Sequence, residues 1–297
     1  MRRGGSKSRD AVPGSTRDPE AVGLRRSVEV PGRAREGVAR WGWRIAVGLM
    51  IAALAGPLAA QDRSLLSEKA GAEFRGVGRL NVYGSRFCTA TLIDETHILT
   101  AAHCLYSPVS KNPVRLHGLV FVAGQRKDSE VAVRRVVRMA TLPGFDFSAA
   151  ANLGDVARDM ALLELDRPIA ARVAPSFPVA RSGGEKGGVI VSYAKDRPFA
   201  PSIEGPCPAL TVTGGVAVLA CGVNSGVSGA PVFSGQPGQR RVVAVVSAMS
   251  RDTAGRDVAL TVIAPPRIAA LRAALAAQPV KSVAAQDAER ERRRQAD

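Results

Sequence analysis

Short apolar stretches separated by turn residues dominate the chain from about residue 76 onward. Six of them come first, at residues 76–82, 87–93, 97–100, 114–123, 130–138 and 160–165. A stretch rich in proline and alanine separates these from six more, at residues 187–193, 208–212, 215–221, 230–234, 240–249 and 258–264. Evenly spaced short segments of this kind are typical of β-strands in sandwiches and barrels. The pattern therefore predicts an all-β protein with two antiparallel, six-stranded barrels or sandwiches, at about residues 72–166 and 175–264.

Only the C-terminal region shows a convincing helical pattern. After a Pro–Pro pair, three apolar residues recur at helical spacing: Ile268, Leu271 and Leu275. We therefore expect an amphipathic helix over residues 266–278 that packs on the second set of strands. Residues 281–297 are charged on all sides, which predicts a solvated and disordered tail.

An uncharged, apolar run from residue 45 to 61 indicates export. The run is somewhat short for a membrane span, and it has the length of a signal-peptide core. Arg40 and Arg44 form its positive flank, and Ala60 offers a small residue for cleavage. The sequence thus predicts a signal peptide over residues 38–60, or alternatively an uncleaved N-terminal anchor. Without an uncleaved leader we expect no stable association with a membrane.

The first 37 residues differ from an ordinary leader. They are of mixed charge, basic overall and rich in proline and glycine, and they show no apolar periodicity. Such a composition predicts a disordered basic extension. Translation could instead begin near Val38. Arginine far outnumbers lysine, and alanine and valine are abundant, as in proteins encoded by GC-rich bacterial genes, so we expect a periplasmic or secreted bacterial protein.

Export gives the four cysteines a structural role. They allow three disulfide connectivities, among which the spacing favours two local pairs. Cys88 and Cys104 bracket two apolar runs around a polar turn, and Cys207 and Cys221 bracket a similar pair around two glycines. Each pair can meet at the open end of a hairpin. No cluster with zinc-ligand spacing occurs, and we expect no metal.

The net charge of +15 invites a nucleic-acid interpretation. Residues 61–297 carry about +9 of it, without a basic cluster among aromatic residues. Nucleic acid is therefore not an expected partner. A basic surface that binds an anionic polymer stays open as a minor hypothesis.

Three segments carry a recognisable chemistry. They read LTAAHC at residues 99–104, RDMALLEL at residues 158–165 and GVSGAP at residues 226–231. In this order they resemble the motifs of the trypsin-like (chymotrypsin-fold) serine peptidases, and the resemblance extends over about residues 72–278. It implies a peptidase domain over residues 61–280, with two β-barrels and an active site between them. The catalytic residues implied are His103, Asp159 and Ser228.

These residue types suit one another chemically. A serine hydroxyl needs an imidazole to take its proton, and a carboxylate holds that imidazole in one tautomer. Asp146 and Asp155 compete with Asp159 for the carboxylate role, but only Asp159 directly precedes the apolar strand of the motif. His97 and His117 have no motif around them, so we expect ordinary strand or turn histidines.

The resemblance also implies roles for residues around the nucleophile. Gly226 and Ser228 would supply the backbone N–H groups of the oxyanion hole. Ser247 matches the family's serine behind the catalytic aspartate, at the start of the strand that pairs with the substrate backbone. Gly222 lies six residues before the nucleophile, and Met249 lies two after Ser247, where both would line the substrate pocket.

Two departures from the trypsin pattern are informative. Val227 stands where zymogen-activated relatives have an aspartate that pairs with a new N-terminal amine, so that activation switch cannot operate. In this respect the chain is similar to the glutamyl endopeptidase-like group. Gly222 stands where trypsin has the carboxylate that binds basic side chains, so cleavage after Arg or Lys is disfavoured. Met249 would narrow the pocket, which favours small or aliphatic side chains.

The sequence thus predicts an exported serine endopeptidase that acts through an acyl-enzyme. We expect a monomer with protein or peptide substrates and no cofactor, since the triad needs none. The alternative is a catalytically silent binding protein with the same fold.

Overall fold

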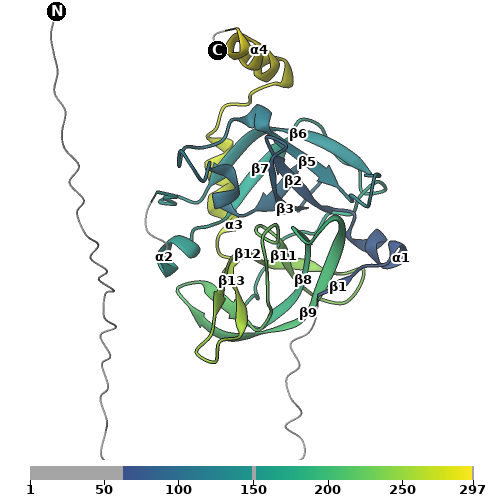
Figure 1. The fold of residues 1–297 in the computed structure, drawn as a ribbon, viewed down its shortest axis with the longest axis vertical. Helices are drawn as coiled ribbons and strands as arrows, with labels where there is room; N and C mark the ends of the chain where they lie inside the picture. The colour runs from purple at the N-terminus through teal and green to yellow at the C-terminus, as the bar shows by residue number, and fades with distance from the viewer. Residues whose placement is uncertain (1–62, 149–151, 296–297) are drawn as a thin grey trace, which may run out of the picture. The chain divides into compact units, whose positions relative to one another are not determined.

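The computed structural model describes residues 63–148 and 152–295, and Figure 1 shows their arrangement. The extension over residues 1–37 and the signal peptide over residues 38–60 lie outside the described residues. Within the described part, strands predominate over helices. No helix there combines the length and the apolar character that a membrane crossing requires.

Six antiparallel strands form the first barrel. They are β2 (Val77–Val82), β3 (Arg86–Leu92), β4 (His97–Thr100), β5 (Leu119–Ala123), β6 (Ala132–Thr141) and β7 (Ala161–Leu165). The barrel closes in the order β2-β3-β4-β7-β6-β5. Leu80, Leu92, Phe121 and Leu163 fill its interior and are completely buried. Alternating residues of these strands supply this core.

A second set of strands also closes into a six-stranded barrel. It contains β8 (Gly187–Ala194), β9 (Arg197–Thr213), β10 (Val216–Leu219), β11 (Pro231–Ser234), β12 (Arg241–Arg251) and β13 (Asp257–Ile263). Pairing of β9 with β8 completes the ring, and β1 (Ser64–Leu65) adds to the outer edge of β9. The predicted fold of two antiparallel, six-stranded β-barrels is confirmed. Strand β9 begins well before the segment predicted at residues 208–212. The apolar pattern missed residues 197–206 because they contain no long apolar run.

The two barrels share an apolar and hydrogen-bonded interface. Phe74, Phe177 and Phe233 pack together there, with ring centroids 4.7–6.1 Å apart. Thr89 on β3 accepts a hydrogen bond at its Oγ1 from the Tyr193 N–H on β8, at 3.0 Å. These contacts hold β3 of the first barrel against β8 of the second.

Both disulfides follow the local pairing that the spacing favoured. Cys88 is bonded to Cys104, and Cys207 to Cys221. The first joins β3 to the short 3-10 helix η2 (Ala102–Leu105), and the second joins β9 to the segment after β10. Each disulfide therefore closes a pair of neighbouring strands.

Short helical turns fill the connections between strands. They are α1 (Glu68–Gly71), η1 (Ala72–Phe74), η3 (Leu116–Gly118) and α2 (Leu153–Val156). The predicted C-terminal helix is α3 (Ile268–Ala276), whose Leu271 and Leu275 are buried in the core between the barrels. The helix itself is confirmed, but its neighbouring strands are β6 and β7 of the first barrel, so the expectation that it packs on the second set of strands was wrong.

The expectation of a disordered tail was wrong for most of its length. Residues Val283–Arg294 form a helix, α4, which begins with Ser282 as its N-cap. Gln286 is buried on the first barrel, and its Nε2 donates to the Val136 carbonyl at 2.8 Å. Ion pairs join Arg135 to Asp287 and Arg115 to Glu289. Polar contacts rather than apolar ones anchor this helix, so hydrophobic periodicity gave no sign of it.

Candidate active site

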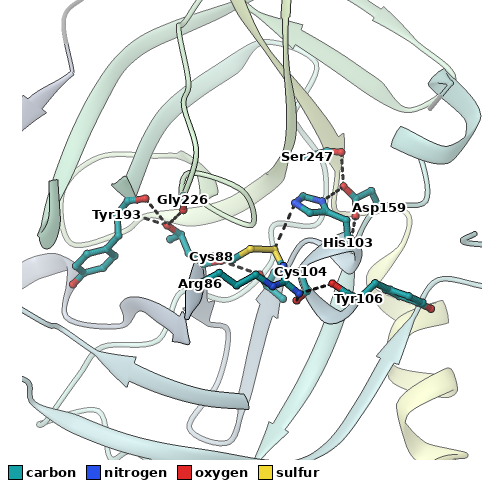
Figure 2. Close-up of a disulfide and its surroundings, with 11 residues drawn as sticks. Arg86, Cys88, His103, Cys104, Tyr106, Asp159, Tyr193, Gly226 and Ser247 are labelled. Carbon is teal, nitrogen blue, oxygen red and sulfur yellow. Dashed lines mark hydrogen bonds and ion pairs between the residues drawn. A yellow bond between two sulfur atoms is a disulfide. The ribbon is translucent and has the colours of Figure 1, made fainter. Parts of the chain in front are cut away.

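His103 lies on the 3-10 turn η2 that follows strand β4. Its neighbours on both sides, Ala102 and Cys104, are completely buried, which leaves the half-buried imidazole to face outward. The Cys88–Cys104 disulfide holds this turn to β3, and the Arg86 guanidinium donates to the carbonyls of Cys104 and Tyr106 (Figure 2). Covalent and polar bonds therefore fix the turn directly after the histidine.

Asp159 is buried beside His103, immediately before strand β7. Its Oδ2 lies 2.7 Å from His103 Nδ1, and its Oδ1 accepts from the His103 backbone N–H at 2.7 Å. The Ser247 hydroxyl donates to Oδ2 at 2.5 Å (Figure 2). A carboxylate with three donors, taken from both barrels, can orient the imidazole and stabilise its charged form.

The competing carboxylates make local contacts. Asp155 Oδ2 lies 2.5 Å from Asn152 Nδ2, and Asp146 Oδ1 accepts from the Ser148 hydroxyl at 2.6 Å. Both residues line a cavity of about 280 Å³ together with His103, Asp159, Ser247 and Phe147. Of the three candidate carboxylates, Asp159 is therefore the one that bonds to His103 in the structure.

Two glycines bring the Ser228 loop against the first barrel. Gly226 has φ +95° and Gly229 has φ +80°. A Cβ on Gly229 would lie 2.1 Å from Thr100 Oγ1, and one on Gly226 would lie 2.6 Å from the Phe87 ring. Side chains at these positions would prevent the loop from closing on the barrel. The Ser228 carbonyl accepts a hydrogen bond from the Thr89 N–H at 2.8 Å. This bond holds Ser228 beside strand β3 of the first barrel.

The backbone of this loop leaves two donors open. The Gly226 carbonyl accepts from Thr89 Oγ1 at 2.9 Å, but the N–H groups of Gly226 and Ser228 donate to no protein group among residues 63–148 and 152–295. Unpaired N–H groups two residues apart are what an oxyanion hole requires.

The Ser228 hydroxyl makes no hydrogen bond to His103 within the part of the chain that the structure describes. His103 Nε2, the ring nitrogen opposite Asp159, lies 3.7 Å from Cys104 Sγ (Figure 2). The catalytic serine–histidine hydrogen bond is often long or absent in ligand-free structures. The site therefore contains an oriented His–Asp pair and a serine loop, without the bond between them.

An arginine at the start of the described chain braces the Ser228 loop. Arg63 donates to Asn224 Oδ1 at 3.0 Å and pairs with Asp196 at 2.8 Å. Asn224 donates in turn to Asp196 at 2.9 Å, and its carbonyl accepts from the Val227 N–H. The Val227 side chain is buried in the second barrel. The sequence gave no signal for this brace, because its members lie far apart along the chain.

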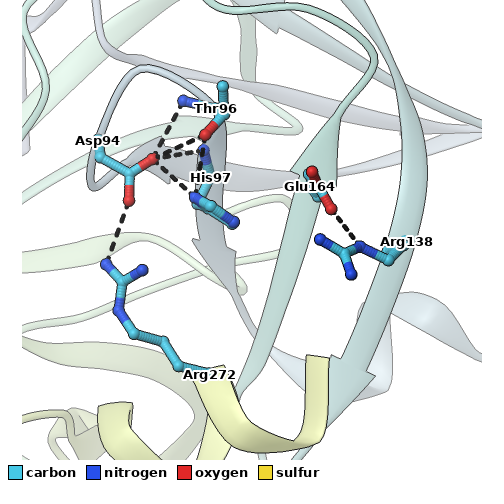
Figure 3. Close-up of polar contacts among 6 residues, drawn as sticks. All are labelled: Asp94, Thr96, His97, Arg138, Glu164 and Arg272. Carbon is cyan, nitrogen blue, oxygen red and sulfur yellow. Dashed lines mark hydrogen bonds and ion pairs between the residues drawn. The ribbon is translucent and has the colours of Figure 1, made fainter. Parts of the chain in front are cut away.

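The two remaining histidines lie outside this site. His97 bonds to Asp94, which also binds the Thr96 N–H and Arg272 on α3 (Figure 3). Burial alone would raise the pKa of Asp94, but these hydrogen bonds hold that pKa well below its usual range. His117 packs against the Tyr83 ring, and burial lowers the pKa of its imidazole. Both have the structural roles that the sequence predicted.

No metal centre emerges among the described residues. The two groups of candidate ligand atoms there are Cys88, His103 and Cys104, and Glu204, Cys207 and Cys221. In each group both sulfurs belong to a disulfide, and metals bind the free thiolate.

Comparisons with known proteins agree with this geometry. A protein-family model described as Trypsin matches residues 67–186, which include His103 and Asp159. This chain is similar to the trypsin-like serine peptidases. Among solved structures, one described as a Glu endopeptidase in complex with MPD matches with a TM-score of 0.58 at 18% sequence identity. That match covers 73% of this chain and 98% of the other. No curated protein sequence matches significantly.

The trypsin-like similarity is unevenly distributed along the chain. The family match ends at residue 186, before the Ser228 loop. For the second barrel the similarity consists of the shared fold and the GVSGAP segment.

Proposed function

We propose that the protein is an exported serine endopeptidase with His103, Asp159 and Ser228 as its catalytic triad. The observation that carries the proposal is the buried Asp159 carboxylate, bonded to both His103 Nδ1 and Ser247 Oγ. Burying a carboxylate requires hydrogen bonds that favour its charged form. Here those bonds also fix the ring of a histidine next to a serine loop, as nucleophilic catalysis by serine requires.

The chemistry follows from this orientation. With its Nδ1–H donated to Asp159, the imidazole presents an unprotonated Nε2 that accepts the proton of the Ser228 hydroxyl. Ser228 Oγ attacks the peptide carbonyl, and His103 then gives its proton to the leaving amine as the C–N bond breaks. Water, activated by His103, hydrolyses the acyl-enzyme and regenerates the hydroxyl.

The unpaired N–H groups of Gly226 and Ser228 would bind the oxygen of the tetrahedral intermediate. Each such donor typically contributes about 3 kcal/mol to lowering the barrier. Strand β12, from Ser247 to Met249, would pair with the substrate backbone, and Gly222 and Met249 would contact the side chain that precedes the scissile bond. The reaction needs no cofactor, and we propose a monomer that acts on protein or peptide substrates.

Export is consistent with the cysteine chemistry. All four cysteines form disulfides, which persist in oxidising compartments. Together with the apolar run over residues 45–61, this supports a periplasmic or secreted location.

One observation favours a second candidate, a catalytically silent binding protein. Among the described residues, Ser228 makes no hydrogen bond to His103, and His103 Nε2 contacts a disulfide sulfur instead. A fold does not by itself prescribe catalysis.

Hydrolysis of a fluorescently labelled protein separates the two candidates. We expect the chain from residue 61, purified with both disulfides formed, to cleave casein, and Ser228→Ala to lose that activity at unchanged melting temperature. A folded wild type that binds casein without cleaving it would favour the binding protein.

A further inference from the structure

A cavity of about 270 Å³ lies where helix α4 docks on the first barrel. Its walls come from three parts of the chain: the segment around η3, strand β6, and the connection from α3 into α4. Figure 1 shows α4 at the end of the first barrel that faces away from the second barrel. His103, Asp159 and Ser228 do not line this cavity, so it is separate from the candidate active site.

Basic side chains outnumber acidic ones in the lining of this cavity. Arg115, Arg138 and Lys281 contribute three cations, and Glu289 is the one carboxylate that lines it among the residues that the structure describes. Glu289 accepts a hydrogen bond from Arg115 at 2.7 Å and pairs with Lys281 at 3.4 Å. The hydrogen bond from Arg115 and the charge of Lys281 lower the pKa of Glu289. A single carboxylate is thus shared between two cations, which leaves positive charge at the cavity.

Arg138 has hydrogen-bond donors that no protein group uses. Its Nε donates to Glu164 on the neighbouring strand (Figure 3). Its two terminal nitrogens donate to no acceptor in residues 63–148 and 152–295. The Arg138 side chain is only 22% exposed, so its charge is partly shielded from water. The two terminal nitrogens of a guanidinium form a planar fork that matches the two oxygens of a carboxylate.

The rest of the wall is largely apolar. Val114, Leu116, Met139 and Pro279 contribute aliphatic surface. His117 also lines the cavity, and burial lowers the pKa of its imidazole, which is therefore uncharged at neutral pH. The volume is slightly below the usual range for small-molecule pockets. It gives room for on the order of ten non-hydrogen atoms, since a water molecule in the liquid occupies about 30 Å³.

We propose that this cavity is a second ligand site, which binds a small organic acid with a carboxylate on a short aliphatic body. The carboxylate accepts hydrogen bonds from the terminal nitrogens of Arg138 and from Lys281 Nζ. The aliphatic body contacts Leu116 and Met139. The inference does not rest on the proposed peptidase function.

Other classes of ligand fit the cavity less well. An inorganic anion leaves the apolar wall in contact with water, and a neutral apolar molecule leaves the donors of Arg138 without a partner. Because the walls come from both the first barrel and α4, a bound acid also adds contacts between them.

Methionine methyl groups report on this cavity directly. From residue 61 onward the methionines are Met139, Met160 and Met249. Met139 lines the cavity, Met160 is completely buried, and Met249 is exposed on β12 of the second barrel. In the full mature chain with isotope-labelled methionine methyl groups, we expect hexanoate to shift the Met139 signal saturably in an NMR titration. The Met249 signal should stay in place.

Hexanamide provides the matched neutral ligand, because it has nearly the same size and shape as hexanoate without the charge. It should bind at least about tenfold more weakly, since it lacks charge-assisted hydrogen bonds to Arg138 and Lys281. Equal binding of the two compounds would show that the cavity recognises only the aliphatic body, and it would overturn the inference.

Variants of the lining assign the binding to these cations. Arg138→Gln and Lys281→Gln should each weaken hexanoate binding about tenfold. Lys186→Gln removes an exposed lysine of the second barrel and should leave binding unchanged. Should Arg138→Gln fail to fold because Glu164 loses its partner, Lys281→Gln still decides the question, since the Lys281 side chain is 52% exposed.

The remaining outcomes are equally decisive. No saturable shift of Met139, a shift of Met249 alone, or unchanged binding in Lys281→Gln would each overturn the inference. Acetyl-leucine, which carries the carboxylate of a peptide C-terminus, separates two sources of the acid. Tighter binding of acetyl-leucine than of hexanoate supports a peptide C-terminus as the ligand, and weaker binding supports a free organic acid.

Discussion

At the residue scale, the proposed catalysis depends on a single carboxylate, that of Asp159. Asp159 is 5% exposed and accepts three hydrogen bonds, two from His103 and one from Ser247. A buried carboxyl group with this many donors is tightly oriented, so we expect its substitution to disturb the orientation of the His103 ring.

Replacing Asp159 by Asn should reduce kcat about 10⁴-fold with little change in KM, because the amide can hold His103 in the wrong tautomer. The measurement is steady-state hydrolysis at pH 7. Asp155→Asn is the matched control, since Asp155 lines the same cavity but makes no bond to His103. Equal losses in both variants would contradict the assignment.

Ser247→Ala removes the hydroxyl that donates to Asp159 from the second barrel. The loss of one hydrogen bond to a buried carboxylate should lower the free energy of unfolding by about 1–3 kcal/mol and kcat/KM by about tenfold. Chemical denaturation and peptide hydrolysis measure the two effects. Ser250→Ala, on the exposed end of β12, should change neither.

The sequence predicted the residues of the candidate site better than their surroundings. His103, Asp159 and Ser228 stand in contiguous motifs, and both disulfides close local hairpins, so short-range patterns were sufficient. Arg63 could not be found in this way, because it contacts Asn224 from a distant part of the chain, and such a contact follows only from the tertiary structure.

At the scale of elements, the serine loop is held by the brace from Arg63 to Asn224 and Asp196. Residue 227 is a valine that is buried among apolar side chains, so no carboxylate at that position can hold this loop through an ion pair. The brace therefore adds to the hydrogen bonds from Thr89 that hold the carbonyls of Gly226 and Ser228.

Arg63→Ala should lower kcat about tenfold through loss of loop order, with a smaller change in KM. Arg63→Lys should restore part of the activity, because an ammonium still pairs with Asp196 but lacks the second, forked contact to Asn224. Hydrolysis kinetics and melting temperatures are the readouts. A fall in melting temperature with unchanged kcat would show a purely structural role.

A second contact between elements joins helix α3 to the turn between β3 and β4. Arg272 pairs with Asp94 at 3.1 Å, beside the hydrogen bonds from His97 and Thr96 (Figure 3). These bonds hold the folded-state pKa of Asp94 below its unfolded value of about 3.9. The stabilisation is therefore present above that pH and is lost as the pH falls below it.

Asp94→Asn should be less stable than the wild type at pH 7, and this difference should shrink as the pH falls below about 3.9. Urea denaturation at a series of pH values measures it. Asp128→Asn, an exposed carboxylate without a partner of this kind, serves as control. A difference that grows on acidification would contradict the sign assigned to Asp94.

At the scale of the whole molecule, apolar periodicity predicted both barrels and helix α3. It failed for α4, which docks on the first barrel through Gln286 and ion pairs rather than through an apolar stripe. Charged side chains on every face are equally typical of a solvated tail, so the sequence could not distinguish the two. The backbone N–H of Lys281 also donates to Val137 on the first barrel.

Deletion of residues 281–297 should lower the free energy of unfolding by about 1–3 kcal/mol, because it exposes the partners of Gln286 and Lys281. The melting temperature should fall by several degrees, with kcat/KM unchanged. Gln286→Ala should reproduce part of this loss, whereas the exposed Arg292→Ala should not. A truncated chain with unchanged stability would contradict the docking of α4.

The most direct test of the central claim is labelling of the disulfide-bonded chain, beginning at residue 61, with a fluorophosphonate probe. This reagent reacts with a serine hydroxyl that a neighbouring base has activated. We expect a covalent adduct on Ser228 that is absent from Ser228→Ala and greatly reduced in His103→Ala. A folded wild type that stays unlabelled, or that is labelled equally in all three proteins, would contradict it.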